Sequence, residues 1–146
     1  MEVLILILVV LLLGVIWYVS TLNKLNRSIV KVDESLSGID VALTKRYDVL
    51  TKMIDVVKSY AKHEKETLID VIKLRNNMSI KEMSQANQKM DDTMKKINVV
   101  VENYPELKSS ENYKTLQQSI VDVEEHLQAA RRVYNSNVSY YNQLLV

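Results

Sequence analysis

The chain has very few of the residues that close tight turns. Its 146 residues include two glycines and one proline. Five or more strands would need turn residues at each connection, so this composition argues strongly against a β-sheet protein. Apolar residues instead recur at spacings of three and four between Lys, Glu, Gln, Asp and Asn, which is typical of amphipathic helices. The sequence therefore predicts an all-α protein with one domain.

Two further features of the composition exclude classes of function. The chain has no cysteine, which excludes disulfides, thiolate metal sites and a cysteine nucleophile. Its formal net charge is +1, and lysines and arginines form no dense run. Nothing therefore indicates a nucleic-acid partner.

A stretch without charge, VLILILVVLLLGVIWYV, runs from Val3 to Val19. With residues 20–22 it just spans a hydrocarbon core of about 30 Å. Leu, Ile and Val occupy every face, unlike a core helix of this length, and Trp17 and Tyr18 resemble interfacial aromatic residues. The alternative is a cleaved signal peptide, which would need a basic region before the stretch and a small-residue cleavage site after it. We predict a transmembrane anchor over residues 1–20 and a helical bundle over residues 21–146.

The basic residues that flank the stretch predict its orientation. None precedes it, whereas Lys24, Arg27 and Lys31 follow it. Positive residues favour the cytoplasmic side. We expect a single-pass protein of the bacterial cell membrane with its N-terminus outside and the bundle in the cytoplasm.

Four apolar stripes after the anchor predict an antiparallel up-down four-helix bundle. The predicted helices are 20–47, 50–77, 80–104 and 111–145. Ser79 and Glu82 form a capping box at the start of the third helix, Pro105 ends it, and Ser109 or Ser110 caps the fourth. The first stripe keeps a heptad spacing through Leu22, Leu25, Ile29, Val32, Leu36, Ile39 and Leu43.

The boundary between the first two bundle helices has no turn residue. We place a break near Tyr47–Thr51, because one helix over residues 20–77 would be roughly 85 Å long and could not cover its own apolar stripe. That single helix is the alternative.

No catalytic or metal-binding pattern is complete. His63 and Glu64 lack the second histidine that a zinc-protease helix needs, and neither His63 nor His126 follows a glutamate by three residues as in di-iron bundles. No serine on a strained turn with glycines on both sides is present to hold a nucleophile, although a Ser-His-Asp triad remains open. We therefore predict no enzyme activity and no metal or cofactor.

Glu64 lies on the inner stripe of the predicted second helix, with His63 beside it. A carboxylate there must reach solvent, be paired, or bind a ligand. The layer predicted around it contains Val32, Met94 and Ile120, with no cation evident. A solvated margin is therefore the interpretation we favour for this polar seam, over a buried polar layer that fixes register.

The predicted topology collects basic residues at the membrane-proximal end, with Arg131 level with residue 20. They are Lys24, Arg27, Lys73, Arg75, Lys81, Arg131 and Arg132. This basic collar would contact the bilayer, including anionic lipid, unless these residues are ordinary solvated surface. The last helix is longer than the first, so its end should reach the headgroups with Tyr140 and Tyr141, unless it frays.

Several blocks of the sequence resemble the LemA family of bacterial membrane proteins. They are GIDVALTKRYDVL (Gly38–Leu50), VVKSYAKHEKETL (Val56–Leu68), YPELKSSENYKTLQ (Tyr104–Gln117) and AARRVYNSNVSYYNQLL (Ala129–Leu145). The chain departs from the family where Leu36 replaces a common Trp and Thr51-Lys52 replaces a common Pro-Asn. Family chains also often continue past the position of Val146, so this one is expected to be short or truncated.

The resemblance implies a single-span protein with a cytoplasmic helical bundle and no established enzymatic activity. A similar magnetosome-membrane protein indicates, by analogy, a role in membrane organisation. We predict a scaffold that binds the lipid bilayer and an unknown protein partner or further copies of itself. The alternatives are a self-assembling membrane-shaping protein, through apolar residues such as Val30, Val41, Val99 and Val100, and a metal- or small-ligand-binding bundle using His63, Glu64 and His126.

Overall fold

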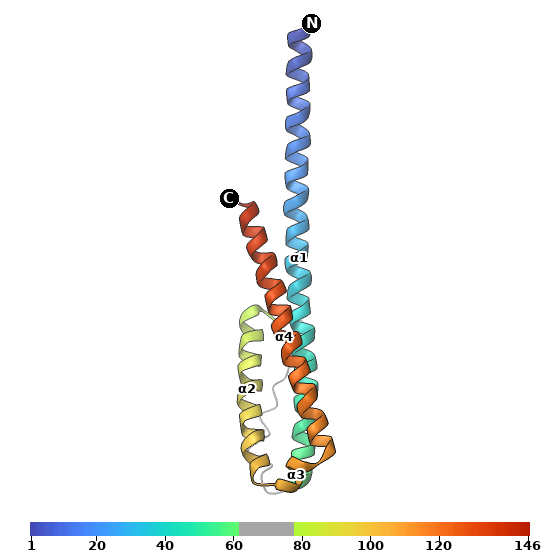
Figure 1. The fold of residues 1–146 in the computed structure, drawn as a ribbon. Helices are drawn as coiled ribbons and strands as arrows, with labels where there is room; N and C mark the ends of the chain where they lie inside the picture. The colour runs from blue at the N-terminus through green and yellow to red at the C-terminus, as the bar shows by residue number, and fades with distance from the viewer. Residues whose placement is uncertain (62–77) are drawn as a thin grey trace.

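The computed structural model describes residues 1–61 and 78–146 (Figure 1). The helices in these ranges are α1 (Glu2–Tyr60), α2 (Ile80–Glu102), α3 (Pro105–Ser109) and α4 (Glu111–Leu144). Neither range contains a β-strand, which confirms the prediction of an all-α protein.

The directions of the three long helices are those that an up-down order gives to its first, third and fourth helices, while most of the predicted second helix lies outside the described residues. α1 and α2 run in the same direction, and α4 returns alongside α1 in the opposite direction (Figure 1). α4 is the main packing partner of α1, and α2 packs on α1 less extensively. The antiparallel up-down order of four helices is therefore not confirmed by the part of the chain that the structure describes.

α1 continues through the segment where a break was predicted. Its buried residues keep steps of three and four through that segment: Ile39, Leu43, Arg46, Leu50, Met53 and Val57. No glycine or proline interrupts them, and the hydroxyl of Thr51 donates a hydrogen bond to the carbonyl of Tyr47 (2.9 Å) inside the helix. The predicted break near Tyr47–Thr51 was therefore wrong, because the buried stripe continues through a polar residue, Arg46.

The first part of the predicted helix over residues 50–77 consequently belongs to α1. Residues 50–60 are the last turns of α1, which ends at Tyr60 with Ala61 as its C-cap. The remainder of that predicted helix, from residue 62, lies outside the described residues.

The first third of α1 carries the apolar stretch, and its side chains are exposed on every face. This helix is long and apolar enough to cross a membrane. The same helix then enters the packed core without interruption, so the apolar stretch and the core share one rigid axis (Figure 1).

The predicted ends of α2 and α4 agree with the structure to within two residues. Ser79 and Glu82 form the expected capping box: the Ser79 backbone N–H donates to Glu82 Oε2 (2.8 Å), and Glu82 N–H donates to Ser79 Oγ (3.3 Å). Ser110 caps α4 by accepting from the Tyr113 N–H (3.3 Å). Pro105 opens the short helix α3, where its fixed φ suits the first turn.

The core lies where α1, α2 and α4 meet and is closed at one end by α3. Its fully buried side chains include Leu43, Met53, Val57, Met90, Ile97, Leu107, Tyr113 and Leu127. The Tyr113 hydroxyl donates to Asn98 Oδ1 (3.5 Å). Burial raises the pKa of Tyr113 above its ordinary value of 10.0, and a hydrogen bond with Gln117 acts in the opposite direction.

The register between α1 and α4 differs from the predicted one. The Asn137 amide donates to the carbonyl of Lys31 (3.1 Å), and Arg131 borders a cleft with Leu36 and Ile39. The prediction that Arg131 lies level with residue 20 was wrong, because α1 turns near residue 60 and not near residue 48. The hydrogen bond between Asn137 and Lys31 puts Arg131 level with residue 37, so the returning helix is displaced by about 25 Å along α1.

Candidate functional site

Arg46 links the three long helices at one point in the core. Its Nη1 donates to the side-chain oxygen (2.6 Å) and the backbone carbonyl (3.3 Å) of Asn87 on α2. Its Nη2 donates to Asp91 on the same helix (2.6 Å) and forms an ion pair with Glu124 on α4. We call Arg46, Asn87, Asp91 and Glu124 the polar clamp.

The cation of the polar clamp is buried, whereas its anions reach solvent. The Arg46 side chain is 7% exposed, and those of Asp91 and Glu124 are 44% and 34% exposed. A planar guanidinium can bond several acceptors at once, so one residue fixes α2 and α4 relative to α1.

Arg46 was not among the predicted site residues, although its position in the sequence contains a signal. The residue lies three after Leu43 and four before Leu50, on the stripe that was assigned to two separate helices. Within the mid-bundle layer, Met94 and Ile120 each lie one turn from a partner of Arg46. A cation therefore lies near Met94 and Ile120, while Glu64, around which the cation-free layer was predicted, lies outside the described residues.

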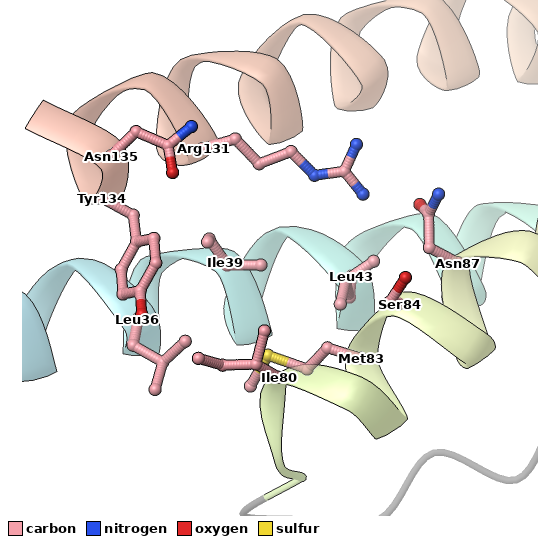
Figure 2. A pocket seen from close by; sticks show the side chains of 10 residues that line it. All are labelled: Leu36, Ile39, Leu43, Ile80, Met83, Ser84, Asn87, Arg131, Tyr134 and Asn135. Atoms are coloured by element: carbon pink, nitrogen blue, oxygen red, sulfur yellow. The ribbon is translucent and has the colours of Figure 1, made fainter. Parts of the chain in front are cut away.

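A cleft of about 400 Å³ lies between α1, α2 and α4, next to the polar clamp (Figure 2). Its lining residues are Leu36, Ile39, Leu43, Ile80, Met83, Ser84, Asn87, Arg131, Tyr134 and Asn135. The apolar side chains form its floor, and Tyr134 lies near Leu36 at one end (Figure 2). Arg131 extends toward the other end, where Ser84 and Asn87 lie (Figure 2). Asn87 belongs to both the cleft and the polar clamp.

The residues of the predicted basic collar are not all brought together. Lys24 and Arg27 lie on the exposed part of α1 just after the apolar stretch. Lys81 follows Ile80, which borders the cleft beside Leu36, so Lys81 is roughly 20 Å farther along α1 than Lys24. Arg131 and Arg132 are exposed on α4 near the same cleft. Lys73 and Arg75 lie outside the described residues.

Some of the other predicted site residues are described by the structure and others lie outside the described residues. Tyr140 and Tyr141 lie in the last turns of α4, exposed and partly buried respectively. His63 and Glu64, the predicted polar seam, lie outside the described residues. His126 is exposed on α4, and among residues 1–61 and 78–146 no three His, Asp or Glu side chains are close enough to hold a metal ion.

The apolar residues considered for lateral contacts are not all on the surface. Val30, Val41 and Val99 are exposed, each by more than half of its surface. Val100 is buried in the core, so it cannot contribute to an outer contact.

Fold and site together define an α-helical protein whose apolar N-terminal helix runs unbroken into a core that one buried arginine ties together. The sequence profile of the LemA family matches residues 35–146, which is most of the chain. The chain belongs to the LemA family.

A curated relative, Protein LemA from Metamycoplasma hominis, is 28% identical to the chain over 130 residues. The aligned region covers 86% of the chain and 59% of that protein. The chain thus spans about three fifths of the length of this curated relative.

Proposed function

We propose that the chain is a membrane-anchored, non-enzymatic scaffold of the bacterial cell membrane, with its helical bundle in the cytoplasm, where it binds a protein partner or further copies of itself. The continuity of α1 carries this proposal. One helix contains both an apolar stretch that is exposed on every face and the central stripe of the core. A bundle attached in this way is held at a fixed height above a bilayer, as a scaffold requires.

The residues around the end of the apolar stretch support an anchor. Trp17 and Tyr18 lie where interfacial aromatic residues are typical. Lys24 and Arg27 follow on a face of α1 that also bears Val19 and Asn23, along a shallow groove. Basic side chains at this height contact phosphate headgroups and favour the cytoplasmic side.

The roles of polar side chains in the core support a structural function. Arg46 is engaged by three residues of the polar clamp. The hydroxyls of Ser28 and Ser35 donate to carbonyls of their own helix at Leu25 (2.7 Å) and Val32 (2.8 Å). Arg46 holds helix contacts, and the two serine hydroxyls satisfy their hydrogen bonds within α1, so these groups serve the fold.

Extraction and crosslinking of the full chain in bacterial membranes test the scaffold. We expect the chain to resist alkaline carbonate and to crosslink reproducibly to a partner or to itself. The matched control is a chain with Leu8→Lys and Leu12→Lys, which should be released by carbonate and lose those crosslinks. Release of the unaltered chain would contradict the anchor, and an anchored chain without specific crosslinks would contradict the scaffold.

The cleft beside the polar clamp favours a second candidate function, the binding of a small amphiphile. Leu36, Ile39 and Met83 offer an apolar floor, and Arg131 offers a cation at the rim. This pairing suits an acyl chain with an anionic head. A fluorescent fatty acid should bind the purified chain and bind Arg131→Ala several-fold more weakly. Arg132→Ala is the matched control, because Arg132 is also exposed but does not line the cleft.

A further inference from the structure

The end of α4 extends beyond the start of α2 toward the apolar part of α1 (Figure 1). α2 begins at Ile80, which borders the cleft beside Leu36 and Tyr134. α4 continues from Tyr134 to Leu144, nearly three further turns. Over these turns α1 and α4 are the described helices that lie side by side, and their ends diverge (Figure 1).

The hydrogen bond between Asn137 and Lys31 sets the height of the α4 end (3.1 Å). Leu144 lies seven residues after Asn137 on α4, and Lys24 lies seven before Lys31 on the antiparallel α1. Both steps are about 10 Å long, so Leu144 comes level with Lys24. The end of α4 therefore lies about 7 Å along the axis from Val19, the last residue of the apolar stretch.

That height is the headgroup region of a bilayer anchored by α1. A bilayer measures about 40–45 Å with its headgroups and about 30 Å without them, which leaves several ångströms of interface on each side. Lys24 lies within this interface when residues 3–22 fill the hydrocarbon core. The end of α4 lies within the same interface.

The side chains of this α4 end suit such an interface. Tyr140 is 49% exposed and Leu145 is 58% exposed, while Tyr141 and Leu144 are partly buried. Tyrosines prefer the boundary between headgroups and acyl chains, and leucines gain from burial there. No basic residue lies in the last turn of α4, so any attraction to lipid is apolar and insensitive to salt.

We infer that residues 140–145 of α4 form a second membrane contact, which inserts Leu144 and Leu145 into the lipid headgroup layer beside the α1 anchor and holds Tyr140 and Tyr141 at the outer edge of that layer. The inference rests on the proposed anchor. Its consequence is that the bilayer holds the bundle at two points, so α1 cannot tilt or rotate freely relative to the membrane. The occupant is lipid because Leu144 and Leu145 are level with the interface, while Tyr140 and Tyr141 lie about 4–6 Å farther from the hydrocarbon core.

The experiment uses the full chain in phosphatidylcholine vesicles. The chain has no cysteine, so Gln143→Cys, at an exposed position, accepts a single fluorescent label. Lys114→Cys, exposed near the opposite end of α4, is the matched control. Headgroup-nitroxide lipid reports docking by quenching the label. Brominated acyl chains report insertion of the anchor separately, by quenching Trp17, the sole tryptophan.

We expect nitroxide lipid to quench the label at position 143 in low and in high salt, and to leave the label at position 114 unquenched. Tyr140→Asp with Leu144→Asp should abolish the quenching at position 143. Ser139→Asp with Asn142→Asp adds the same charge at polar positions and should retain it.

Three results would overturn the inference. Quenched Trp17 with an unquenched label at position 143 would remove the second contact and leave the anchor intact. Quenching that survives Tyr140→Asp with Leu144→Asp would show that these side chains do not dock. Unquenched Trp17 would remove the anchor and the second contact together.

Discussion

At the scale of single residues, Arg46 determines how the helices meet. A buried cation requires nearby acceptors, because the cost of removing it from water is large. Asn87, Asp91 and Glu124 supply those acceptors from two helices that pack on α1. A shift of α2 or α4 by one turn would separate Arg46 from them, so the polar clamp selects one register of the bundle.

Replacing Arg46 by alanine should lower the free energy of unfolding. The exposed parts of Asp91 and Glu124 can be rehydrated, so we expect a loss of about 1–3 kcal/mol, typical of hydrogen bonds to a charged group. Arg46→Met keeps more of the packing and should lose less. Urea unfolding in mild detergent measures both, with the exposed Lys45→Ala as a control expected within about 0.5 kcal/mol. An Arg46→Ala chain as stable as the control would show that the polar clamp contributes no stability.

Tyr113 should make stability fall at alkaline pH. Burial raises its pKa in the folded chain above the ordinary value of 10.0, so the folded state retains the phenol proton more strongly than the unfolded state. The resulting stability is fully present at neutral pH and is lost as pH rises through 10.0 toward the folded-state pKa.

Urea midpoints at increasing pH, compared with those of Tyr113→Phe, isolate this contribution. The phenylalanine variant should lose stability less steeply in alkali. Tyr140→Phe changes an exposed phenol and should keep the original slope. Parallel slopes for the original chain and Tyr113→Phe would contradict the assignment.

At the scale of elements, residues that act locally could be predicted and residues that act at a distance could not. Ser79 and Ser110 cap their helices because a hydroxyl three residues before a backbone N–H is a local geometry. The course of α1 past Tyr47 depends on partners of Arg46 that lie more than forty residues away. A polar residue on an apolar stripe resembles an interruption until its partners are known.

The cleft could not be predicted for the same reason. Leu36, Met83 and Tyr134 belong to three different helices. Whether they lie together depends on where α1 ends. α1 ends about twelve residues later than predicted. Every α4 residue was therefore predicted opposite the wrong part of α1. The basic collar, built on those levels, joined residues that the structure separates.

Gly38 offers a test of α1 as one continuous helix. It lies in the interior of α1, where glycine costs roughly 0.5–1 kcal/mol relative to alanine. A Cβ at this position would meet no atom within 4 Å. Gly38→Ala should therefore stabilise the bundle by roughly 0.5–1 kcal/mol in detergent unfolding. Gly14→Ala, outside the packed core, should leave bundle unfolding unchanged, and destabilisation by Gly38→Ala would indicate a bend or a close contact there.

At the scale of the whole molecule, α1 is one continuous helix that joins the apolar stretch at its start to the packed core at its end. The residues that follow the apolar stretch include Lys24, Arg27 and Lys31, whereas Glu2 is the charged side chain before it. A helix that crosses a bilayer keeps such residues on the cytoplasmic side. The cleft and the polar clamp would then face the cytoplasm, which is the compartment where a partner must be sought.

Single cysteines in the otherwise cysteine-free chain test this orientation in a bacterial host. Glu2→Cys should react with a membrane-impermeant maleimide in intact spheroplasts, because the proposed topology puts residue 2 outside. Lys114→Cys, at the far end of the bundle, should react after permeabilisation and not before. Replacing Lys24, Arg27 and Lys31 by glutamate removes the positive flank, so Lys114→Cys in that background should become partly reactive in intact spheroplasts. Reaction of Lys114→Cys in intact spheroplasts without those replacements would place the bundle outside and reverse the proposed topology.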